Sequence, residues 1–254
     1  NRFILIQMPK STWKPMKPRQ IQMSQIKLWA VIPAAGSGSR FSKTELKQYQ
    51  TIQDRTVLEH TIDRLNALPL QGYVLAIGAQ DTVAKNLNFA ASEKAHFCLG
   101  GAERVHSVLN ALRYLAQIAS DDDYVLVHDA ARPCVSAENL KKLADYCVER
   151  DTAAILAIPV RDTLKFVSDQ HIQNTVSRDH LWQAQTPQMA KLGVLRDAIE
   201  KALNDHINIT DEASALEHAG ISVDVVQGRS DNIKITYTDD LELARLILAS
   251  QHVL

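Results

Sequence analysis

Two kinds of segment alternate along this chain, and their alternation predicts its architecture. From Leu28 onward, short apolar runs rich in β-branched residues are separated by stretches in which apolar residues recur every three or four positions. The first pattern is typical of buried strands and the second of helices with one apolar face. Because alternating strands and helices build βαβ units, we predict a Rossmann-like α/β fold with a mostly parallel central sheet flanked by helices.

The pattern places five strands and three clear helices. One helix is predicted from Arg104 to Ile118, a second after the N-cap residue Ser136, and a third from the cap Thr238 to Ala249. The predicted strands are Trp29–Pro33, Tyr73–Ile77, Tyr124–His128, Ala153–Pro159 and Val223–Val226.

One region breaks the alternation and predicts an inserted arm. Between Val160 and Leu181 the chain reads as two short strands, near 163–167 and 172–176, joined by the turn residues Ser168, Asp169 and Gln170. A two-stranded hairpin is barely stable by itself in water. We therefore expect this arm, at about 160–181, to pack on a second copy of the chain in a homodimer.

The first 25 residues differ from the remainder of the chain. They contain five basic residues, three prolines and no acidic residue. Transit peptides are similarly poor in acids, but an upstream extension outside the fold is the preferred interpretation. We therefore expect residues 1–25 to be a disordered or non-native leader and residues 26–254 to form a single domain.

Composition excludes several classes of protein. A hydrophobic share of 46% allows a large core, and a formal net charge of −1 does not suit a protein that binds nucleic acid through its phosphates. No apolar run reaches the roughly 20 residues of a transmembrane helix, so no membrane partner is expected. The odd number of cysteines, Cys98, Cys134 and Cys147, without a CxxC pair, argues against disulfides or a zinc site and favours the reducing cytoplasm.

The strongest chemical signal follows the first predicted strand, where the chain reads Pro-Ala-Ala-Gly-Ser-Gly-Ser-Arg from Pro33 to Arg40. Small residues and the glycines Gly36 and Gly38 let backbone N–H groups approach a polyphosphate, and Arg40 adds a positive charge. The run is neither a Walker motif nor a complete GxGxxG fingerprint. Taken alone, it fits a tight turn after a strand equally well.

Two lysines are candidates for the same polyphosphate. Lys47 lies seven residues after Arg40, and Lys234 comes late in the chain, where a strand should end before the last helix. Either lysine alone is also compatible with a solvated surface position. Together with the loop, they indicate cations that converge on one phosphate chain.

The segment His128–Pro133 follows an apolar strand, at the edge where open α/β sheets bind ligands. Asp129 is able to accept hydrogen bonds from hydroxyls, and Arg132 is able to bind an anion. The alternative is an aspartate that caps a turn and pairs with Arg132. In the arm, Thr163 and Arg178 are positioned to hold a phosphate from above the sheet, although spacing alone favours a polar solvated hairpin.

These motifs together resemble one family, the 2-C-methyl-D-erythritol 4-phosphate cytidylyltransferases of the non-mevalonate isoprenoid route. The resemblance covers about Leu28 to Leu248 and depends on PAAGSGSR, LKQY, GGAERVHSV, VLVHDAARP, PVRDTLK, TPQ, TDEASALE and DNIKIT, in that order. It implies a nucleotidyltransferase fold. It also implies transfer of CMP from CTP to methylerythritol phosphate, which yields 4-diphosphocytidyl-2-C-methyl-D-erythritol and pyrophosphate.

The resemblance further implies roles for single residues. The family's catalytic cations match Arg40, Lys47 and Lys234. The positions expected to bind CTP are Pro33, Ala34, Ala35, Gly36, Gly38, Gly101, Ala102, Ser107, Asp129 and Ala130. Those expected to bind the acceptor are Asp129, Arg132, Thr163, Arg178 and Thr186, of which Thr163 and Arg178 reach across the dimer interface.

One position departs from the family pattern. Ala102 stands where some members have aspartate. Two consequences are possible at this stage: backbone atoms read the base and nothing changes, or the carboxylate matters and the preference for cytosine is weakened.

Phosphoryl-transfer chemistry sets the demands on such a site. The acceptor phosphate is already a nucleophile, so in-line attack needs alignment and charge neutralisation at the α-phosphate but no general base. We expect Mg²⁺ as cofactor, held mainly by the CTP phosphates and not by protein ligands.

Three other functions are alternatives to this one. A ribitol-5-phosphate cytidylyltransferase would share the nucleotide half of the site and differ at the arm. A non-catalytic nucleotide-binding module would not need cations from three distant segments. An NAD-dependent dehydrogenase is disfavoured because the glycine fingerprint is incomplete.

Overall fold

In the computed structural model of the chain, the structure describes residues 26–36, 41 and 46–251. The predicted leader, residues 1–25, lies outside this part of the chain, and so do the predicted site residues Gly38 and Arg40.

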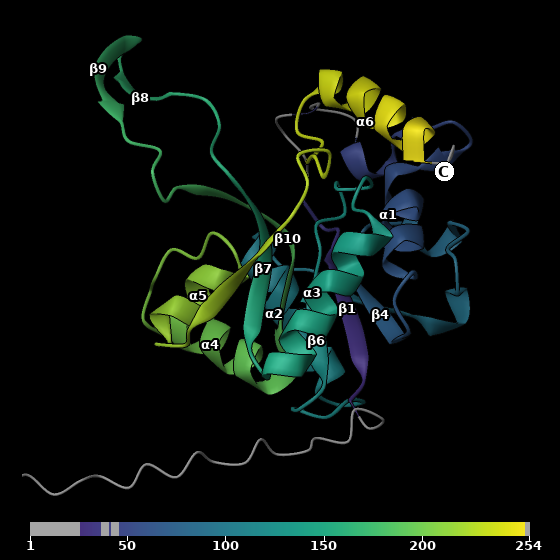
Figure 1. The fold of residues 1–254 in the computed structure, drawn as a ribbon. Coiled ribbons are helices and arrows are strands. Elements are labelled where there is room, and N and C mark those ends of the chain that lie inside the picture. Colours follow the sequence, from purple (N-terminus) through teal and green to yellow (C-terminus); the bar gives the residue numbers. More distant parts are fainter. Residues whose placement is uncertain (1–25, 37–40, 42–45, 252–254) are drawn as a thin grey trace, which may run out of the picture.

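A seven-stranded sheet forms the centre of the molecule (Figure 1). Every neighbouring pair of strands is parallel except those made by β10, which is antiparallel to both β6 and β7. The prediction of a mostly parallel sheet is therefore confirmed, and all five predicted strands are present. In spatial order the strands are β11 (Val223–Gln227), β7 (Ala153–Pro159), β10 (Trp182–Lys191), β6 (Tyr124–Val127), β1 (Leu28–Pro33), β4 (Leu70–Ile77) and β5 (Ala95–Leu99).

Helices cover both faces of this sheet. One face packs on α1 (Val57–Leu65) and α3 (Ala137–Arg150); the other packs on α2 (Arg104–Leu115), α4 (Leu192–Asn204) and α5 (Glu212–His218). Alternate residues of β1 divide between the two cores, because Ile32 packs toward α1 and α3 whereas Val31 packs toward α2 and α4. Since both faces are buried, the strands are apolar throughout, as the sequence pattern indicated.

The remaining described elements are short, apart from the last helix. Helix α6 (Thr238–Gln251) packs through Ala244 and Leu248 onto a smaller third cluster that includes Ile52 and Ile235. The short elements are the strands β2 (Thr51–Ile52) and β3 (Arg55–Thr56) and the 3-10 turns η2 (Lys47–Tyr49), η3 (Ala84–Asn86) and η4 (Ser92–Lys94).

The starts of the helices partly follow the predicted caps. The Ser136 hydroxyl accepts from the Asn139 N–H at the start of α3, which confirms that cap. The predicted cap Thr238 is wrong, because Thr238 is already the first residue of α6. The N–H groups of Thr236 and Tyr237 instead donate to the Asp240 carboxylate, at 2.8 Å each. A side chain inside the first turn thus satisfies amides that precede the helix.

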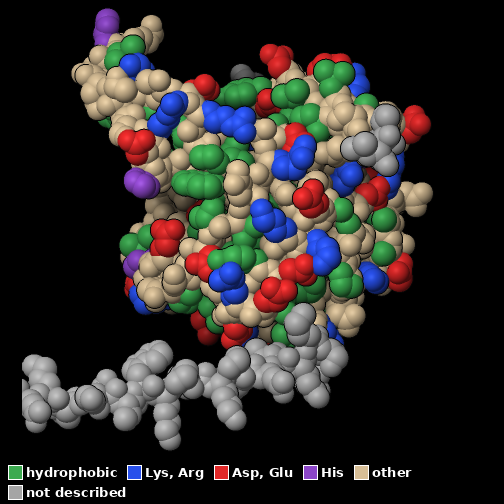
Figure 2. Space-filling view, in the orientation of Figure 1, with side chains coloured by type: hydrophobic (Ala, Val, Ile, Leu, Met, Phe, Trp, Pro, Cys, Tyr) green, Lys and Arg blue, Asp and Glu red, His purple; other side chains and the backbone are tan. Residues whose placement is uncertain are grey.

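The predicted arm is a hairpin that stands away from the sheet (Figures 1 and 2). Strand β8 (Leu164–Ser168) pairs in antiparallel fashion with β9 (His171–Val176). The turn has two residues and not three: Asp169 and Gln170 both have positive φ, 49° and 66°, as in the hairpin turns that match strand twist.

Strand order explains where a ligand site can form. The chain runs from β1 to β4 and β5 on one side, and then returns to β6 on the other side of β1. Loops that leave the carboxyl ends of β1 and β6 therefore diverge, and a crevice opens between them. None of the helices in the described part of the chain is long and apolar enough to cross a membrane.

Candidate active site

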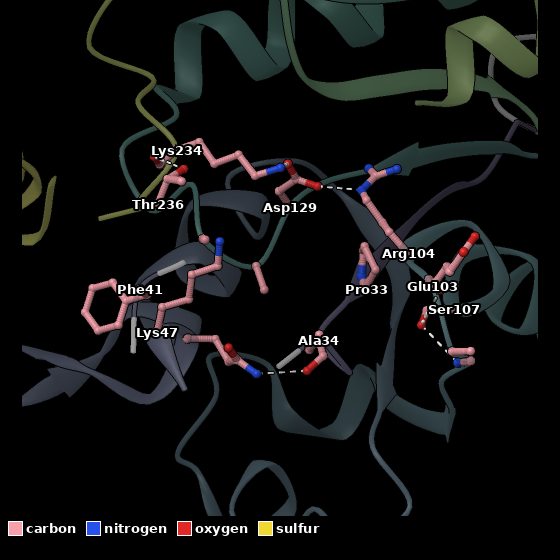
Figure 3. Close-up of a pocket in the computed structure, with 16 residues that line it drawn as sticks. Pro33, Ala34, Phe41, Lys47, Glu103, Arg104, Ser107, Asp129, Lys234 and Thr236 are labelled. Atoms are coloured by element: carbon pink, nitrogen blue, oxygen red, sulfur yellow. Dashed lines mark hydrogen bonds and ion pairs between the residues drawn. The ribbon is translucent and has the colours of Figure 1, made fainter. Parts of the chain in front are cut away.

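A pocket opens at this carboxyl edge of the sheet (Figure 3). Its volume of about 330 Å³ lies within the range of small-molecule sites. The residues predicted to bind or act on a nucleotide gather here from segments far apart in the sequence. Ten of them line the pocket: Pro33, Ala34, Gly36, Lys47, Gly101, Ala102, Ser107, Asp129, Ala130 and Lys234.

The backbone after β1 forms one wall. The Ala34 N–H donates to the Ala76 carbonyl at 2.8 Å, and the Ala34 carbonyl accepts from Gln48 Nε2 at 3.0 Å. A Cβ placed on Gly36 would meet no atom of the described residues within 4 Å. Because the described residues leave this space open, the glycine at position 36 keeps room for a ligand beside its backbone.

The start of α2 forms the opposite wall. The Gly101 N–H donates to Ser107 Oγ at 3.0 Å, which ties the loop to the first turns of the helix. A Cβ on Gly101 would come within 2.3 Å of the His106 Cβ, so glycine is required for this close approach. Since Ala102 has only a methyl group, the polar atoms that it offers to a ligand are those of its backbone.

Lys47 and Lys234 reach the pocket from opposite ends of the chain. Lys47 begins η2, and Lys234 lies between β11 and α6. Lys47 Nζ donates to the carbonyl of Ile235 at 3.0 Å, and Lys234 Nζ pairs with Asp129 Oδ2 at 2.7 Å. The Lys47 contact joins segments 188 positions apart in the chain. Both lysines line the same pocket (Figure 3).

Asp129 is the anionic centre of the pocket. Its Oδ1 accepts from Arg104 Nε at 2.8 Å, and its Oδ2 lies 2.7 Å from Lys234 Nζ and 3.8 Å from Arg132 Nε. Burial alone would raise the pKa of Asp129, but the three positive charges outweigh burial and hold the pKa well below its ordinary value. The carboxylate is therefore ionised at neutral pH.

A buried histidine fixes the backbone beside Asp129. Burial lowers the pKa of His128 to about 4, so the ring is neutral at neutral pH. Its Nε2 lies 3.0 Å from the Arg132 carbonyl, which only accepts, so the ring proton is on Nε2. Nδ1 then accepts from the Thr186 hydroxyl at 2.9 Å, and Thr186 Oγ1 accepts from the Asp129 N–H at 3.1 Å.

Five predicted site residues lie outside the pocket. Thr186 and Arg132 adjoin it through Asp129, and Arg132 Nη1 also donates to the Asn232 carbonyl at 2.6 Å. Ala35 lines a neighbouring pocket of about 270 Å³. Thr163 and Arg178 are exposed on the arm and do not line this pocket within one chain.

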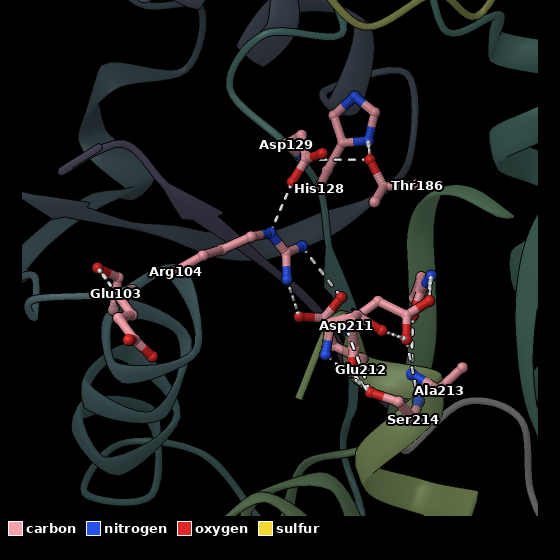
Figure 4. A network of polar contacts seen from close by, with 12 residues as sticks. Glu103, Arg104, His128, Asp129, Thr186, Asp211, Glu212, Ala213 and Ser214 are labelled. Carbon is pink, nitrogen blue, oxygen red and sulfur yellow. Dashed lines mark hydrogen bonds and ion pairs between the residues drawn. The ribbon is translucent and has the colours of Figure 1, made fainter. Parts of the chain in front are cut away.

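Two charged residues of the site, the half-buried Arg104 and the buried Glu212, escaped the sequence prediction (Figure 4). Arg104 and Glu212 form a bidentate ion pair, with N–O distances of 2.6 and 3.1 Å. The positive charge of Arg104 is reinforced, because Glu212 and Asp129 raise its pKa despite burial. Both residues lie in motifs of the family resemblance, GGAERVHSV and TDEASALE, but nothing local in either motif shows that they meet.

The described residues contain no group of three or more histidine, cysteine, aspartate or glutamate side chains placed to hold a metal ion. Among the described residues that line the pocket, the acidic ones are Glu103 and Asp129. This donor set does not form a protein cage for a cation. It fits a hard cation such as Mg²⁺ only when substrate phosphates supply most of the ligands.

Comparison with known proteins agrees with this geometry. Residues 28–250 match the family described as 2-C-methyl-D-erythritol 4-phosphate cytidylyltransferase. The protein of that name from Acinetobacter baylyi is 71% identical over 237 residues, which cover 93% of this chain and 99% of the relative. The protein of that name from Vibrio vulnificus is 46% identical over 230 residues, which cover 90% of this chain and 97% of the relative.

Solved structures give the same result. A crystal structure of 4-diphosphocytidyl-2C-methyl-D-erythritol synthase superposes with a TM-score of 0.78 at 36% identity, over 88% of this chain and 99% of that one. The Francisella tularensis 2-C-methyl-D-erythritol 4-phosphate cytidylyltransferase superposes with a TM-score of 0.76 at 36% identity, over 87% of this chain and 99% of that one. Sequence and fold together show that this chain belongs to the 2-C-methyl-D-erythritol 4-phosphate cytidylyltransferase family.

Proposed function

We propose that this chain transfers CMP from CTP to 2-C-methyl-D-erythritol 4-phosphate in the pocket at the carboxyl edge of the sheet. Membership of the family makes it a nucleotidyltransferase. The observation that supports this pocket as the reaction site is the convergence of Lys47 and Lys234 beside the loop after β1. Cations from distant segments on one pocket fit a triphosphate ligand.

The nucleotide is proposed to lie along both walls. Pro33, Ala34 and Gly36 offer backbone to the phosphates, and Lys47 and Lys234 offer positive charge. Arg40 and Gly38 join them in the proposal on the strength of the family resemblance. The base and ribose are assigned to Gly101, Ala102, Ser107, Asp129 and Ala130 on the other side of the pocket, and to Ala35 of the loop after β1.

The proposed reaction is one in-line displacement. An oxygen of the acceptor phosphate attacks the α-phosphorus of CTP, a P–O bond forms, and the bond to the β-phosphate oxygen breaks. The electron pair leaves with pyrophosphate, so no general base is required. The protein aligns the two phosphates and neutralises the charge that builds up on the α-phosphate, through Lys47, Arg40 and Lys234.

Mg²⁺ is the proposed cofactor, carried by the CTP phosphates. When bound, it neutralises phosphate charge and polarises the α-phosphate for attack. Asp129, a carboxylate that lines the pocket, is already paired with Arg104 and Lys234. The expected result is that chelation by EDTA abolishes turnover and that added Mg²⁺ restores it.

The arm is proposed to complete the acceptor site of a second copy of the chain. Three large apolar side chains on the hairpin, Phe166, Val167 and Ile172, are more than half exposed, at 59%, 51% and 64%. Such exposure favours a partner surface. In the resulting homodimer, Thr163 and Arg178 of one protomer bind the methylerythritol phosphate beside Asp129, Arg132 and Thr186 of the other.

The domain organisation and the cellular location are proposed from the sequence. Residues 26–254 are proposed to act as one nucleotidyltransferase domain, and residues 1–25 as a leader without a part in catalysis. All three cysteines are free, which fits the proposed cytoplasmic location.

Pyrophosphate release tests the function directly. The purified chain is incubated with CTP, Mg²⁺ and either 2-C-methyl-D-erythritol 4-phosphate or ribitol 5-phosphate, with reactions lacking an acceptor as controls. Rapid release is expected only with the methylerythritol phosphate. Release that is equally fast with ribitol 5-phosphate, or absent with both, contradicts the proposal. Replacing CTP by UTP in the same assay measures how far a pocket with Ala102 still selects cytosine.

A further inference from the structure

Arg104 and Glu212 have no part in the proposed reaction so far, although both belong to motifs of the family resemblance. They lie 108 positions apart in the chain, one at the start of α2 and the other at the start of α5. Arg104 Nη1 and Nη2 donate to the two oxygens of Glu212, at 2.6 and 3.1 Å (Figure 4). The Glu212 side chain is only 3% exposed.

The same guanidinium also holds Asp129. Arg104 Nε donates to Asp129 Oδ1 at 2.8 Å, while both Nη atoms bind Glu212. A guanidinium is planar and its N–H directions are fixed. Once Glu212 clamps one edge, Nε–H is presented to Asp129 in a single orientation.

The sheet fixes Glu212 in turn. Gln188 lies on β10 and is paired with Val127, the last residue of β6, which lies two positions before Asp129. Gln188 Oε1 accepts from the Ala213 N–H, and Gln188 Nε2 donates to Asp211 Oδ2, both at 2.9 Å. The first turn of α5, and Glu212 with it, is therefore anchored to the strand next to the pocket.

Three cations adjoin Asp129, but they are not equivalent during turnover. Lys234 is assigned to the CTP phosphates in the proposed reaction. Arg132 Nε lies 3.8 Å from Asp129 Oδ2, farther than Lys234 Nζ at 2.7 Å. Arg104 makes the close contact to Oδ1 and is balanced by a carboxylate of its own. It is the cation that stays on Asp129 when Lys234 engages the nucleotide.

We propose that Arg104 is a positioning residue for the reaction and that Glu212 acts through it. The Glu212–Arg104 bridge holds Asp129 in one orientation while Lys234 engages the phosphates. This inference rests on the proposed function, because it assigns Lys234 to the nucleotide and Asp129 to the acceptor site. The pyrophosphate assay separates this inference from the proposed function. The activity of the wild-type chain tests the function, and the ratio of the kcat of each variant to that of wild type tests the bridge.

The test measures kcat, both KM values and Tm for four variants. Arg104→Ala is expected to lower kcat by roughly a hundredfold, as for a reacting group misplaced by about 1 Å. KM for CTP is expected to rise much less than kcat falls, because the loop after β1 and Lys47 are untouched and only the contact of Asp129 with the ribose is affected. Glu212→Gln, which keeps the shape but offers one acceptor oxygen, is expected to lower kcat about tenfold.

The remaining two variants separate positioning from folding. Arg104→Ala leaves the Glu212 carboxylate buried and unpaired, so Tm should fall. The double variant Arg104→Ala/Glu212→Gln removes that charge and should recover Tm but not kcat. Arg104→Lys keeps a charge without the fork and should restore kcat only in part.

The chain provides a matched control on the same helix. Arg113 of α2 pairs with Glu200 of α4 at 2.9 Å, on the surface and outside the pocket. Arg113→Ala and Glu200→Gln are expected to leave kcat within about twofold of wild type, as for other exposed ion pairs.

Three results would overturn the proposal. The first is a double variant that regains kcat together with Tm, since the bridge would then serve folding alone. The second is an Arg104→Ala variant that is as active as Arg113→Ala. The third is a Glu212→Gln change that lowers kcat equally with and without Arg104, because Glu212 would then act independently.

Discussion

Among the described residues, the 3-10 turn η2, which contains Lys47, makes three side-chain contacts that depend on the folded chain. The Lys47 side chain reaches the carbonyl of Ile235, next to Lys234, while its neighbour Gln48 is held by the Ala34 carbonyl. Tyr49 of the same turn donates to Asp81. The 3-10 turn is thus fixed on both sides, and the lysine is pre-positioned at the pocket.

We predict that Lys47→Ala lowers kcat by a hundredfold or more. A cation about 4 Å from a phosphate charge contributes on the order of 4 kcal/mol at an effective dielectric constant of about 20. A hundredfold loss corresponds to about 2.7 kcal/mol, so this single charge is sufficient to cause it. The measurement is steady-state pyrophosphate release at saturating CTP. Lys141→Ala, an exposed lysine on α3, is the control, and equal turnover in both variants would contradict the assigned role.

The neutral His128 predicts a pH-dependent stability. Burial lowers its pKa from 6.5 to about 4 in the folded chain. Between these values the unfolded chain binds a proton that the folded chain does not, so the free energy of unfolding falls as pH decreases from about 7 to 4. The loss attributable to His128 is up to about 3 kcal/mol.

Urea unfolding at several pH values measures this effect. His128→Asn removes the titrating group, so the variant should lose less stability than wild type over the same pH range. Asp129 also has a lowered pKa, but its contribution disappears only below its ordinary value, near pH 4. An unchanged pH dependence in the variant would show that another group is responsible.

For single residues of the pocket, the sequence predicted which of them would meet but not all of their partners. The small residues after β1, Asp129 and Lys234 follow strands, and the edge where open α/β sheets bind ligands is the one at the carboxyl ends of their strands. That rule needs no knowledge of side-chain contacts. Arg104 and Glu212 meet only because α2 and α5 cover the same face of the sheet. No spacing in the sequence encodes that contact.

Among the elements, four of the five predicted strands of the central sheet, β1, β4, β6 and β7, lie inside the sheet and are mostly buried, whereas the fifth, β11, lies at its edge. β5 was missed because its run, Ala-His-Phe-Cys-Leu, has no β-branched residue, whereas the other edge strand, β11, has three valines. β10 was missed because its exposed start and the run Gln-Thr-Pro-Gln interrupt the apolar pattern. The shift in pairing between Ala184 and Gln188 lies at this run and brings Thr186 to Asp129. The irregularity that hid the strand therefore serves the site.

Helix capping gives a prediction at this scale. The hydroxyl of Thr56 accepts from the Glu59 N–H, and the Glu59 carboxylate accepts from the Thr56 N–H at 2.7 Å. We predict that Thr56→Ala lowers the free energy of unfolding by about 1 to 2 kcal/mol. Thr238→Ala is the matched control, because Thr238 is exposed and already within its helix, and its effect should stay below about 0.5 kcal/mol. Equal effects in urea unfolding would remove the capping box as the cause.

At the scale of the whole molecule, the arm separates two halves of the proposed site. Within one chain, Arg178 is exposed and does not line the pocket that contains Lys47. We predict that Arg178→Ala raises KM for the methylerythritol phosphate while KM for CTP stays within about twofold, because only a contact to the acceptor is lost. Lys165→Ala on the same arm is the control, since this lysine contacts only Thr175 across the hairpin among the described residues. A rise in KM for CTP would place Arg178 at the nucleotide.

Mixed dimers then decide whether the arm completes its own site or its partner's. If the arm is exchanged, a dimer of one Lys47→Ala chain and one Arg178→Ala chain has both defects in one site and none in the other. Equal mixing makes half of the dimers mixed, and each has one intact site. At a methylerythritol phosphate concentration far below the raised KM of Arg178→Ala, activity should therefore recover to about a quarter of wild type. If each arm serves its own chain, every site keeps one defect and no activity returns. Refolding the two variants together, compared with mixing them after separate refolding, distinguishes these outcomes.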